Sequence, residues 1–161
     1  MKKNTKYLKT EAKIKQAIND LLKKKILNVK VTELCRKAKI YCSTFYRHYH
    51  DINSLVDKTE EDLLKKFHSL VAQKDVNFMT FLFFIYKNQG YFKIALERDN
   101  VRMLTEMVGE YREGIVETWP RYDRKSVDRM FAVYSGEVIA MVIDWEKNGF
   151  NLDDISWYAR R

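Results

Sequence analysis

Apolar side chains recur at three- and four-residue spacing along most of the chain, and little interrupts them. The 161 residues include one proline and five glycines, so the residues that commonly form turns between strands are scarce. This spacing gathers apolar side chains on one face of a helix, whereas a half-buried strand alternates every second residue. The sequence therefore predicts an all-α protein.

The same pattern, together with capping residues, predicts where the helices lie. Asp51 and Asn53 can cap a fourth helix, Pro120 ends a later one, and Gly149 ends the longest one in the C′ position. The first predicted helix begins at about Thr5 or Thr10 and ends at Lys25. The others cover residues 31–38, 43–50, a stretch from the caps to 71, 77–89, 91–98, 100–119, 123–148 and a short segment from 152. We expect two domains, residues 1–52 and 53–161.

The charge of the chain is concentrated at its N-terminal end. Residues 1–50 contain 14 lysines and arginines against 3 acidic residues, a net charge of +11, whereas residues 51–161 contain 16 against 19, a net charge of −3. A basic segment joined to a mildly acidic remainder indicates a head that binds a polyanion and a body with another task. The alternative is a lysine-rich surface that is only solvated.

Several broad classes of protein do not fit this sequence. The longest apolar run, residues 78–86 (FMTFLFFIY), is too short to cross a bilayer, and the lysines at the N-terminus precede no apolar signal segment. Two cysteines in a chain of this size indicate reduced thiols in a cytoplasm. We therefore expect a cytoplasmic protein that is not inserted in a membrane.

No arrangement of residues typical of an enzyme is present. The chain has no glycine-rich phosphate loop, no HExxH motif and no serine in a nucleophile turn. Four glutamates follow one another at helical spacing: Glu106, Glu110, Glu113 and Glu117. Paired carboxylates could hold a di-metal centre, but no Glu-x-x-His accompanies them. A solvated stripe of charged side chains is therefore the simpler interpretation. We expect no catalysis and no cofactor.

One short stretch, CRKAKIYCSTFYRHYHD, holds both cysteines and two of the three histidines. Cys35, Cys42, His48 and His50 have a spacing that matches no common structural zinc site. On a helix the two histidines would point about 200° apart, and Cys35 belongs to an inward-facing apolar stripe. We therefore expect no metal at this stretch.

The same stretch instead predicts a helix-turn-helix. Phe45 and Tyr49 would face inward from the third helix, and the residues on its outer side and flanks are polar or cationic: Ser43, Thr44, Tyr46, Arg47 and His48. Arginine can bond guanine in the major groove, whereas Tyr46 and His48 are placed like phosphate contacts. Lys30 and the lysines of the first helix would flank the backbone of the duplex. The alternative is a three-helix packing unit with an exposed polar face.

At these residues the sequence resembles the TetR/AcrR family of bacterial transcriptional regulators. The segment that matches is VTELCRKAKIYCSTFYRHYHDINSL, preceded by IKQAINDLL, and the resemblance covers about residues 5–65. The family pattern is close to T-V-x-x-L-x-x-x-A-G-V-S-x-S-T-F-Y-x-H-F-x-x-K-x-x-L. Leu34, Ala38, Ile40, Ser43, Thr44, Phe45, Tyr46, His48, Tyr49 and Leu55 fit that pattern. A weaker likeness covers FAVYSGEVIAMVIDWEKNGF, which is similar to the penultimate helix of a Firmicutes-type branch.

The resemblance implies a homodimer that binds a palindromic operator, usually as a repressor, with a C-terminal domain that dimerises and often holds a small effector. By position, Cys42, Ser43, Thr44 and Arg47 would lie near base edges, and Tyr46 and His48 would contact phosphates. Lys30 and Thr32 would begin the helix that crosses the backbone of the duplex. These roles are what the resemblance implies.

The sequence departs from the family pattern at three positions. Lys39 replaces the turn glycine, at a cost of roughly 1 kcal/mol if the residue is left-handed. Tyr41 replaces the small residue that caps the recognition helix, and Ile52 replaces a lysine near a phosphate. These departures leave open a second interpretation, in which a TetR-like protein no longer reads an operator and serves as a protein-interaction or non-specific DNA-binding module.

The helix predicted over residues 123–148 is apolar over more than one face, so it needs a second partner besides its own core. We predict a four-helix dimer interface made from this helix and the preceding helix over residues 100–119. From the 123–148 helix it uses Met130, Tyr134, Val138, Met141, Val142 and Trp145. The many aromatic residues of the C-terminal domain have two interpretations, a packed core or the lining of a cavity for a small apolar effector.

Overall fold

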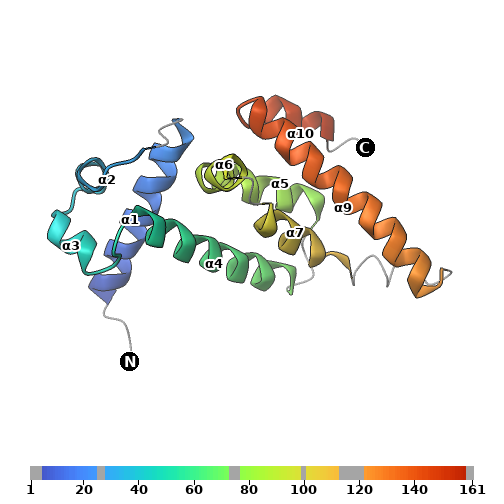
Figure 1. Ribbon diagram of the computed structural model, residues 1–161, viewed down its shortest axis with the longest axis horizontal. Coiled ribbons are helices and arrows are strands. Elements are labelled where there is room, and N and C mark those ends of the chain that lie inside the picture. Colours follow the sequence, from blue (N-terminus) through green and yellow to red (C-terminus); the bar gives the residue numbers. More distant parts are fainter. Residues whose placement is uncertain (1–4, 25–27, 73–76, 99–100, 113–121, 159–161) are drawn as a thin grey trace. The chain divides into compact units, whose positions relative to one another are not determined.

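The computed structural model describes residues 5–24, 28–72, 77–98, 101–112 and 122–158, and within these residues all regular structure is helical (Figure 1). The all-α prediction is confirmed. In chain order the helices are α1 (Thr5–Lys23), α2 (Val31–Ala38), α3 (Cys42–Tyr46), α4 (Ile52–Val71), α5 (Phe78–Lys87), α6 (Gln89–Glu97), α7 (Arg102–Gly109), α9 (Arg124–Lys147) and α10 (Leu152–Tyr158). None of these helices is both long and apolar enough to span a membrane.

The predicted limits hold for most helices and fail at two of them. The prediction of a helix over residues 43–50 is wrong, because α3 ends at Tyr46 and the chain then turns. Tyr49 leaves the helical path to enter the core at 4 % exposure, and Asp51 already caps the next helix. The helix predicted over residues 100–119 is also wrong as a single helix, because α7 ends at Gly109 and the chain turns at residues 110 and 111. Residues 113–119 of that prediction, and its stop at Pro120, lie outside the described residues.

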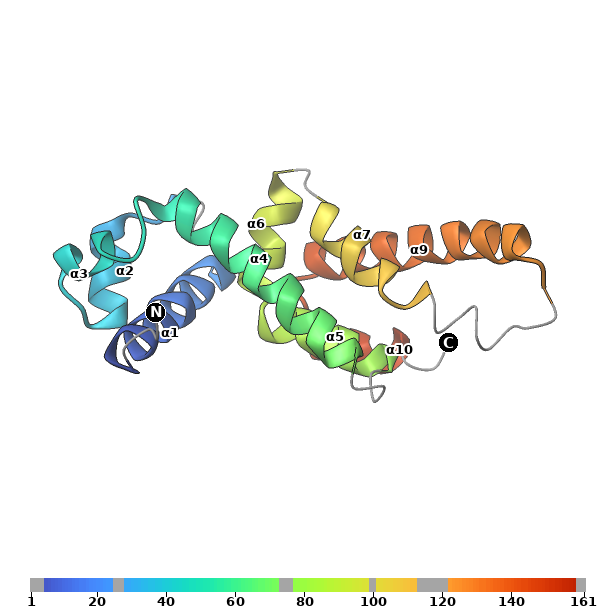
Figure 2. The ribbon, with the colours of Figure 1, turned by 90° about the horizontal axis from the view of Figure 1, so that it is seen from below.

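Two compact units divide the chain, and each is described by itself. The first contains residues 1–62 and 88–94. In it α1 packs against α2, and α2 packs against α3 (Figure 2). Its core is made of fully buried side chains from each of these helices and from the start of α4: Ile14, Ile18, Leu34, Phe45, Leu55 and Val56. The apolar face of α1, which carries Ile14 and Ile18, is therefore the face that packs.

The second unit contains residues 63–87 and 95–161, so α4 and α6 contribute residues to both units. Here α7 packs against α9. The ring of Phe67 meets the rings of Phe81 and Phe84 at centroid distances of 5.9 and 5.2 Å. Trp145 is fully buried beneath Phe150. Many of the aromatic residues therefore form a packed core.

Gly149 ends α9 as the sequence predicted. Its φ is +76°, and its N–H donates to the carbonyl oxygen of Glu146 while the N–H of Phe150 donates to that of Trp145, both at 2.8 Å. This pair of bonds is a Schellman motif, which favours glycine at C′. The indole N–H of Trp145 donates to the carbonyl oxygen of Asn151 at 2.7 Å, which ties the chain after α9 to the core.

Candidate nucleic-acid interface

The turn between α2 and α3 is held by the backbone of α2. Lys39 has a φ of +54°, its N–H donates to the carbonyl oxygen of Arg36, and the N–H of Ile40 donates to that of Cys35 at 3.0 Å. These bonds form a second Schellman motif, with a lysine in the position that favours glycine. Lys39 is left-handed, and the strain of roughly 1 kcal/mol expected from the sequence applies.

The helix α3 begins without a side-chain cap. Tyr41 is its N-cap residue, and only its backbone contributes, because the carbonyl oxygen of Tyr41 accepts from the N–H groups of Thr44 and Phe45. The Tyr41 side chain points away from the core and is 83 % exposed. A large aromatic group therefore stands in solvent beside the start of α3.

The two sides of α3 differ sharply in burial. Phe45 is fully buried, whereas Ser43 and Arg47 are exposed and Tyr46 is 59 % exposed. Cys42 and Thr44 are half-buried at the edge between the two sides. The outer surface offers hydroxyl groups and one guanidinium, which are groups that can bond bases and phosphates.

Arg47 is held close to the helix that precedes it. Its Nη2 donates to Oγ1 of Thr44 at 3.1 Å. This bond joins two of the predicted base-contacting residues and limits the positions that the guanidinium samples. The remaining N–H groups of the fork can bond a planar acceptor such as a guanine edge.

His48 lies against the N-terminal part of α1. Its ring stacks on that of Tyr7 with a centroid distance of 3.9 Å and an interplanar angle of 19°. The side chain is half-buried, so the stack covers part of the ring that was predicted to contact a phosphate. Lys6 and Lys9, which flank Tyr7 on α1, are both exposed.

The remaining predicted residues lie at the start of α2. Lys30, the N-cap residue of α2, and Thr32 are both exposed.

Asp51 and Ser54 cap the start of α4. Oδ1 of Asp51 accepts from the N–H of Ser54 at 2.7 Å, and Oγ of Ser54 accepts from the N–H of Asp51 at 3.0 Å. Hydrogen bonds that the carboxyl accepts from the backbone and the side chain of Ser54 lower the pKa of Asp51 below its usual value.

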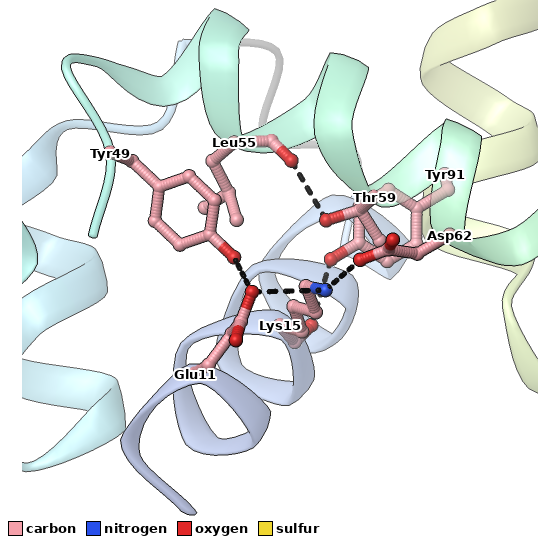
Figure 3. Close-up of polar contacts among 7 residues, drawn as sticks. All are labelled: Glu11, Lys15, Tyr49, Leu55, Thr59, Asp62 and Tyr91. Carbon is pink, nitrogen blue, oxygen red and sulfur yellow. Dashed lines mark hydrogen bonds and ion pairs between the residues drawn. The ribbon is translucent and has the colours of Figure 1, made fainter. Parts of the chain in front are cut away.

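A partly buried polar cluster joins α1 to Tyr49, to the middle of α4 and to α6 (Figure 3). Glu11 is 7 % exposed and accepts from the Tyr49 hydroxyl at 3.2 Å. Lys15 lies 3.5 Å from Glu11 and forms an ion pair with Asp62 of α4. The hydroxyl of Tyr91, from α6, donates to the carbonyl oxygen of Lys15 at 2.9 Å. The position of α3 is therefore set partly by groups that lie far from it in the sequence.

Sequence reasoning did not single out this cluster. The only local signal is the i, i+4 spacing of Glu11 and Lys15 on one helix. Burial of Tyr49 raises the pKa of its hydroxyl, and the charge of Glu11 adds to this effect, so the phenol stays protonated and donates. Tyr41 was noted only as a departure from a family pattern, and its exposure was not predicted.

The predicted dimer residues of α9 fall into two groups. Val138, Val142 and Trp145 are buried by their own chain, and Met141 is half-buried. Met130 and Tyr134 are both 40 % exposed, and Val133 beside them is 68 % exposed. Apolar surface available to a second molecule therefore lies on the part of α9 that carries Met130, Val133 and Tyr134.

A surface cavity of about 360 Å³ lies between α4 and α7 in the second unit, lined by Leu64, Lys65, Phe67, His68, Ser69, Glu106, Met107 and Glu110. Nδ1 of His68 lies 3.0 Å from a carboxylate oxygen of Glu110, so this cavity is polar on one side. Glu113 and Glu117 of the predicted stripe lie outside the described residues. Within the described part of the chain, no three His, Cys, Asp or Glu side chains come together as a metal site.

Comparison of the chain with protein-family models, with curated proteins and with solved structures gave no match.

Proposed function

We propose that the chain is a sequence-specific DNA-binding transcriptional regulator of the TetR type that represses genes by binding a palindromic operator as a homodimer. One observation carries the proposal: α3 buries Phe45 and exposes Ser43, Tyr46 and Arg47 on a segment whose net charge is +11. In this proposal α1, α2 and α3 form a helix-turn-helix domain, and α3 is the recognition helix.

Each exposed group has a task in this proposal. Arg47 bonds a guanine edge from the position that its bond to Thr44 sets. Ser43 and Cys42 lie at neighbouring base edges, and Tyr46 and His48 position the helix through phosphates. Lys30 and Thr32 contact the backbone from the start of α2, and the exposed lysines of α1 add sequence-independent attraction.

The homodimer is proposed to form through α9. Met130, Val133 and Tyr134 leave apolar surface exposed there. Ala132, Gly136 and Ala140 follow one another at four-residue spacing, all three are exposed, and nothing lies within 4 Å of a Cβ built on Gly136. A second helix can approach closely along such a row. A two-fold axis at this point would present two copies of α3 to the two halves of a palindrome.

The C-terminal domain, residues 53–161, has no catalytic role in this proposal and needs no cofactor or metal. The cavity between α4 and α7 is of the size that holds a small molecule. An effector bound there would regulate the affinity of the dimer for its operator. The chain would act in the cytoplasm, where the operator is.

A second candidate function is a TetR-like module that binds DNA without reading sequence, or that binds a protein. Three observations favour it: α3 has only five residues, Lys39 is strained, and Tyr41 places an exposed aromatic ring beside the start of the helix. In that case the basic surface binds all duplexes alike.

The test is selection of bound duplexes from a random-sequence pool at physiological salt. The first candidate predicts a palindromic motif whose affinity exceeds that for unrelated duplexes by about a thousandfold or more. Recovery without any motif would overturn operator reading. Affinity that is equal for all duplexes and falls steeply with salt would then support the second candidate.

Arg47→Ala separates the two candidates with the same assay. Loss of a base contact should cost about 1–3 kcal/mol on the selected duplex and relax the preference at one position of each half-site. Loss of a phosphate contact would weaken all duplexes equally. Arg124→Ala is the matched control, since Arg124 is an exposed arginine on α9, and it should leave binding unchanged.

A further inference from the structure

Tyr41 has the most exposed large apolar side chain among the residues that the structure describes. It is 83 % exposed, whereas Tyr46 on α3 is 59 % exposed and Leu8 on α1 is 48 % exposed. Its ring and hydroxyl make no ring contact or hydrogen bond with any described residue. The side chain therefore adds little to the packing of the first unit. A single exposed ring is common on protein surfaces, so its position decides whether it has a role.

The backbone of Tyr41 is held on both sides. The N–H of Ile40, the residue before it, donates to the carbonyl oxygen of Cys35 at 3.0 Å in the turn after α2. The carbonyl oxygen of Tyr41 accepts from the N–H groups of Thr44 and Phe45 at 2.9 and 3.3 Å in the first turn of α3. The ring therefore moves only about its two side-chain torsions, and little conformational entropy is lost when a partner covers it.

Tyr41 stands at the end of α3 that reaches bases in the proposed function. In a helix-turn-helix the N-terminal residues of the recognition helix contact base edges in the major groove. Tyr41 is the N-cap residue of this helix, and Ser43, two residues later, is exposed on its outer surface. A ring at this position enters the groove when α3 does.

The surroundings of the ring fit a nucleic acid better than a protein. Three exposed cationic side chains precede it in the chain: Arg36, Lys37 and Lys39. A docking site for a protein is a contiguous apolar patch. The nearest exposed residues on either side of Tyr41 in the chain, Lys39 and Ser43, are both polar. An aromatic ring in a cationic setting suits a polyanion that also offers apolar contact.

The major groove offers an aromatic ring one apolar group. Bases present hydrogen-bond donors and acceptors there, and the C5-methyl group of thymine is the exception. Arg47, just beyond the other end of α3, has donors that suit guanine, whereas the ring of Tyr41 has an apolar surface. The two side chains therefore suit different bases of one half-site.

We propose that Tyr41 is a specificity-determining residue that selects thymine by packing its ring on this methyl group. The inference rests on the proposed function, in which α3 is the recognition helix. It adds a base preference to a residue that has no base contact in that function.

The test removes the methyl group from the DNA and leaves the base pair intact. In the duplex selected from the random pool, each thymine is replaced in turn by deoxyuridine, which keeps the O4 acceptor but lacks the C5-methyl group. Affinity is measured by fluorescence anisotropy at physiological salt. We expect one thymine in each half-site whose replacement weakens binding about fourfold, because one buried methyl group is lost.

Two variants assign this effect to the ring. Tyr41→Ser should bind the thymine and deoxyuridine duplexes equally, because no ring is left to cover the methyl group. Tyr41→Phe should keep the difference, since the contact does not use the hydroxyl. Tyr122→Ser is the matched control, because it removes a ring that is 55 % exposed before α9, and it should keep the difference as well. Serine is a favoured N-cap residue, so Tyr41→Ser should melt no lower than the wild type.

Three results would overturn the inference and leave the proposed function standing. Deoxyuridine in place of every thymine could leave the wild-type affinity unchanged. The difference could persist in Tyr41→Ser, which would assign the methyl group to another residue. Tyr41→Phe could abolish it, which would assign the contact to the hydroxyl. Recovery of no motif from the pool would instead overturn the proposed function and this inference together.

Discussion

The side-chain Oδ1 of Asn19 accepts a hydrogen bond from the backbone N–H of Gly90 at 3.0 Å, so the C-terminal part of α1 holds the start of α6. Asn19 is buried, and its partner must come this close for the bond to form. A Cβ on Gly90 would press on the backbone carbonyl oxygen of Asn19 and would lie 2.8 Å from its Oδ1 and 2.9 Å from Cβ of Leu22. Glycine at position 90 is therefore a packing requirement.

Gly90→Ala should destabilise the protein. The added methyl group meets backbone as well as side-chain atoms, so we expect a loss of about 1–3 kcal/mol in the free energy of unfolding, measured by urea denaturation. Gly109→Ala is the control, because nothing lies within 4 Å of a Cβ at that position on α7. It should leave stability unchanged or raise it by up to about 1 kcal/mol. Equal effects of the two variants would contradict the close approach.

Lys39→Gly should stabilise the protein. The residue has a φ of +54° in the turn after α2, which glycine adopts without the clash of a side chain. We expect a gain of roughly 1 kcal/mol in the free energy of unfolding, seen as a higher Tm. Lys37→Gly, two residues earlier and inside α2, should lower it by a similar amount. A destabilising Lys39→Gly would show that the turn is not left-handed in solution.

Tyr49→Phe should weaken the first unit. The change removes the hydroxyl that donates to the buried carboxylate of Glu11 at 3.2 Å and keeps the ring in the core. Loss of a buried hydrogen bond to a carboxylate costs about 2 kcal/mol, measured by chemical denaturation. Tyr46→Phe removes a hydroxyl from a ring that is 59 % exposed and should change stability by less than about 0.5 kcal/mol. A neutral Tyr49→Phe would mean that Glu11 gains nothing from this donor.

Stability should fall in acid partly because of two capping carboxylates. Hydrogen bonds from Ser54 lower the pKa of Asp51 below its ordinary value of 3.8, and those from Ser126 do the same for Asp123. Their contributions are therefore present above the unfolded-state pKa and are lost as the pH falls through the lower folded-state pKa.

The variant with both Asp51→Asn and Asp123→Asn keeps the caps but cannot titrate. Thermal melts over a pH series should find the wild type more stable than the double variant near neutral pH. The difference should shrink as the pH falls below about 3.8. A difference that stays constant in acid would refute this account of the caps.

Val133→Asp should dissociate the proposed dimer. Val133 is 68 % exposed between Met130 and Tyr134, so a carboxylate there would be buried against a second α9. We expect dimerisation to weaken by about 2 kcal/mol or more, measured by sedimentation over a concentration series. The control is Leu152→Asp, which adds the same charge at an apolar residue that is 47 % exposed on α10. A wild-type chain that sediments as a monomer at micromolar concentration would exclude the dimer itself.

The sequence by itself determined the helical class, most helix limits and the burial of Phe45 and Tyr49. These properties depend on which residues lie three or four apart and on local caps such as Asp51, and both are written in consecutive residues. Gly149 and the strained Lys39 were predictable for the same reason, because a left-handed turn is a property of a few neighbouring residues.

Only the tertiary structure decided the rest. α3 ends early because Tyr49 enters a core and bonds Glu11, which lies 38 residues away in the chain. The ion pair of Lys15 with Asp62 and the contact of Asn19 with Gly90 depend on how the helices pack. The same packing buried Val138, Val142 and Trp145 and left Val133 exposed on α9. Periodicity shows that a helix has an apolar face, but it does not show which part of that face its own chain covers.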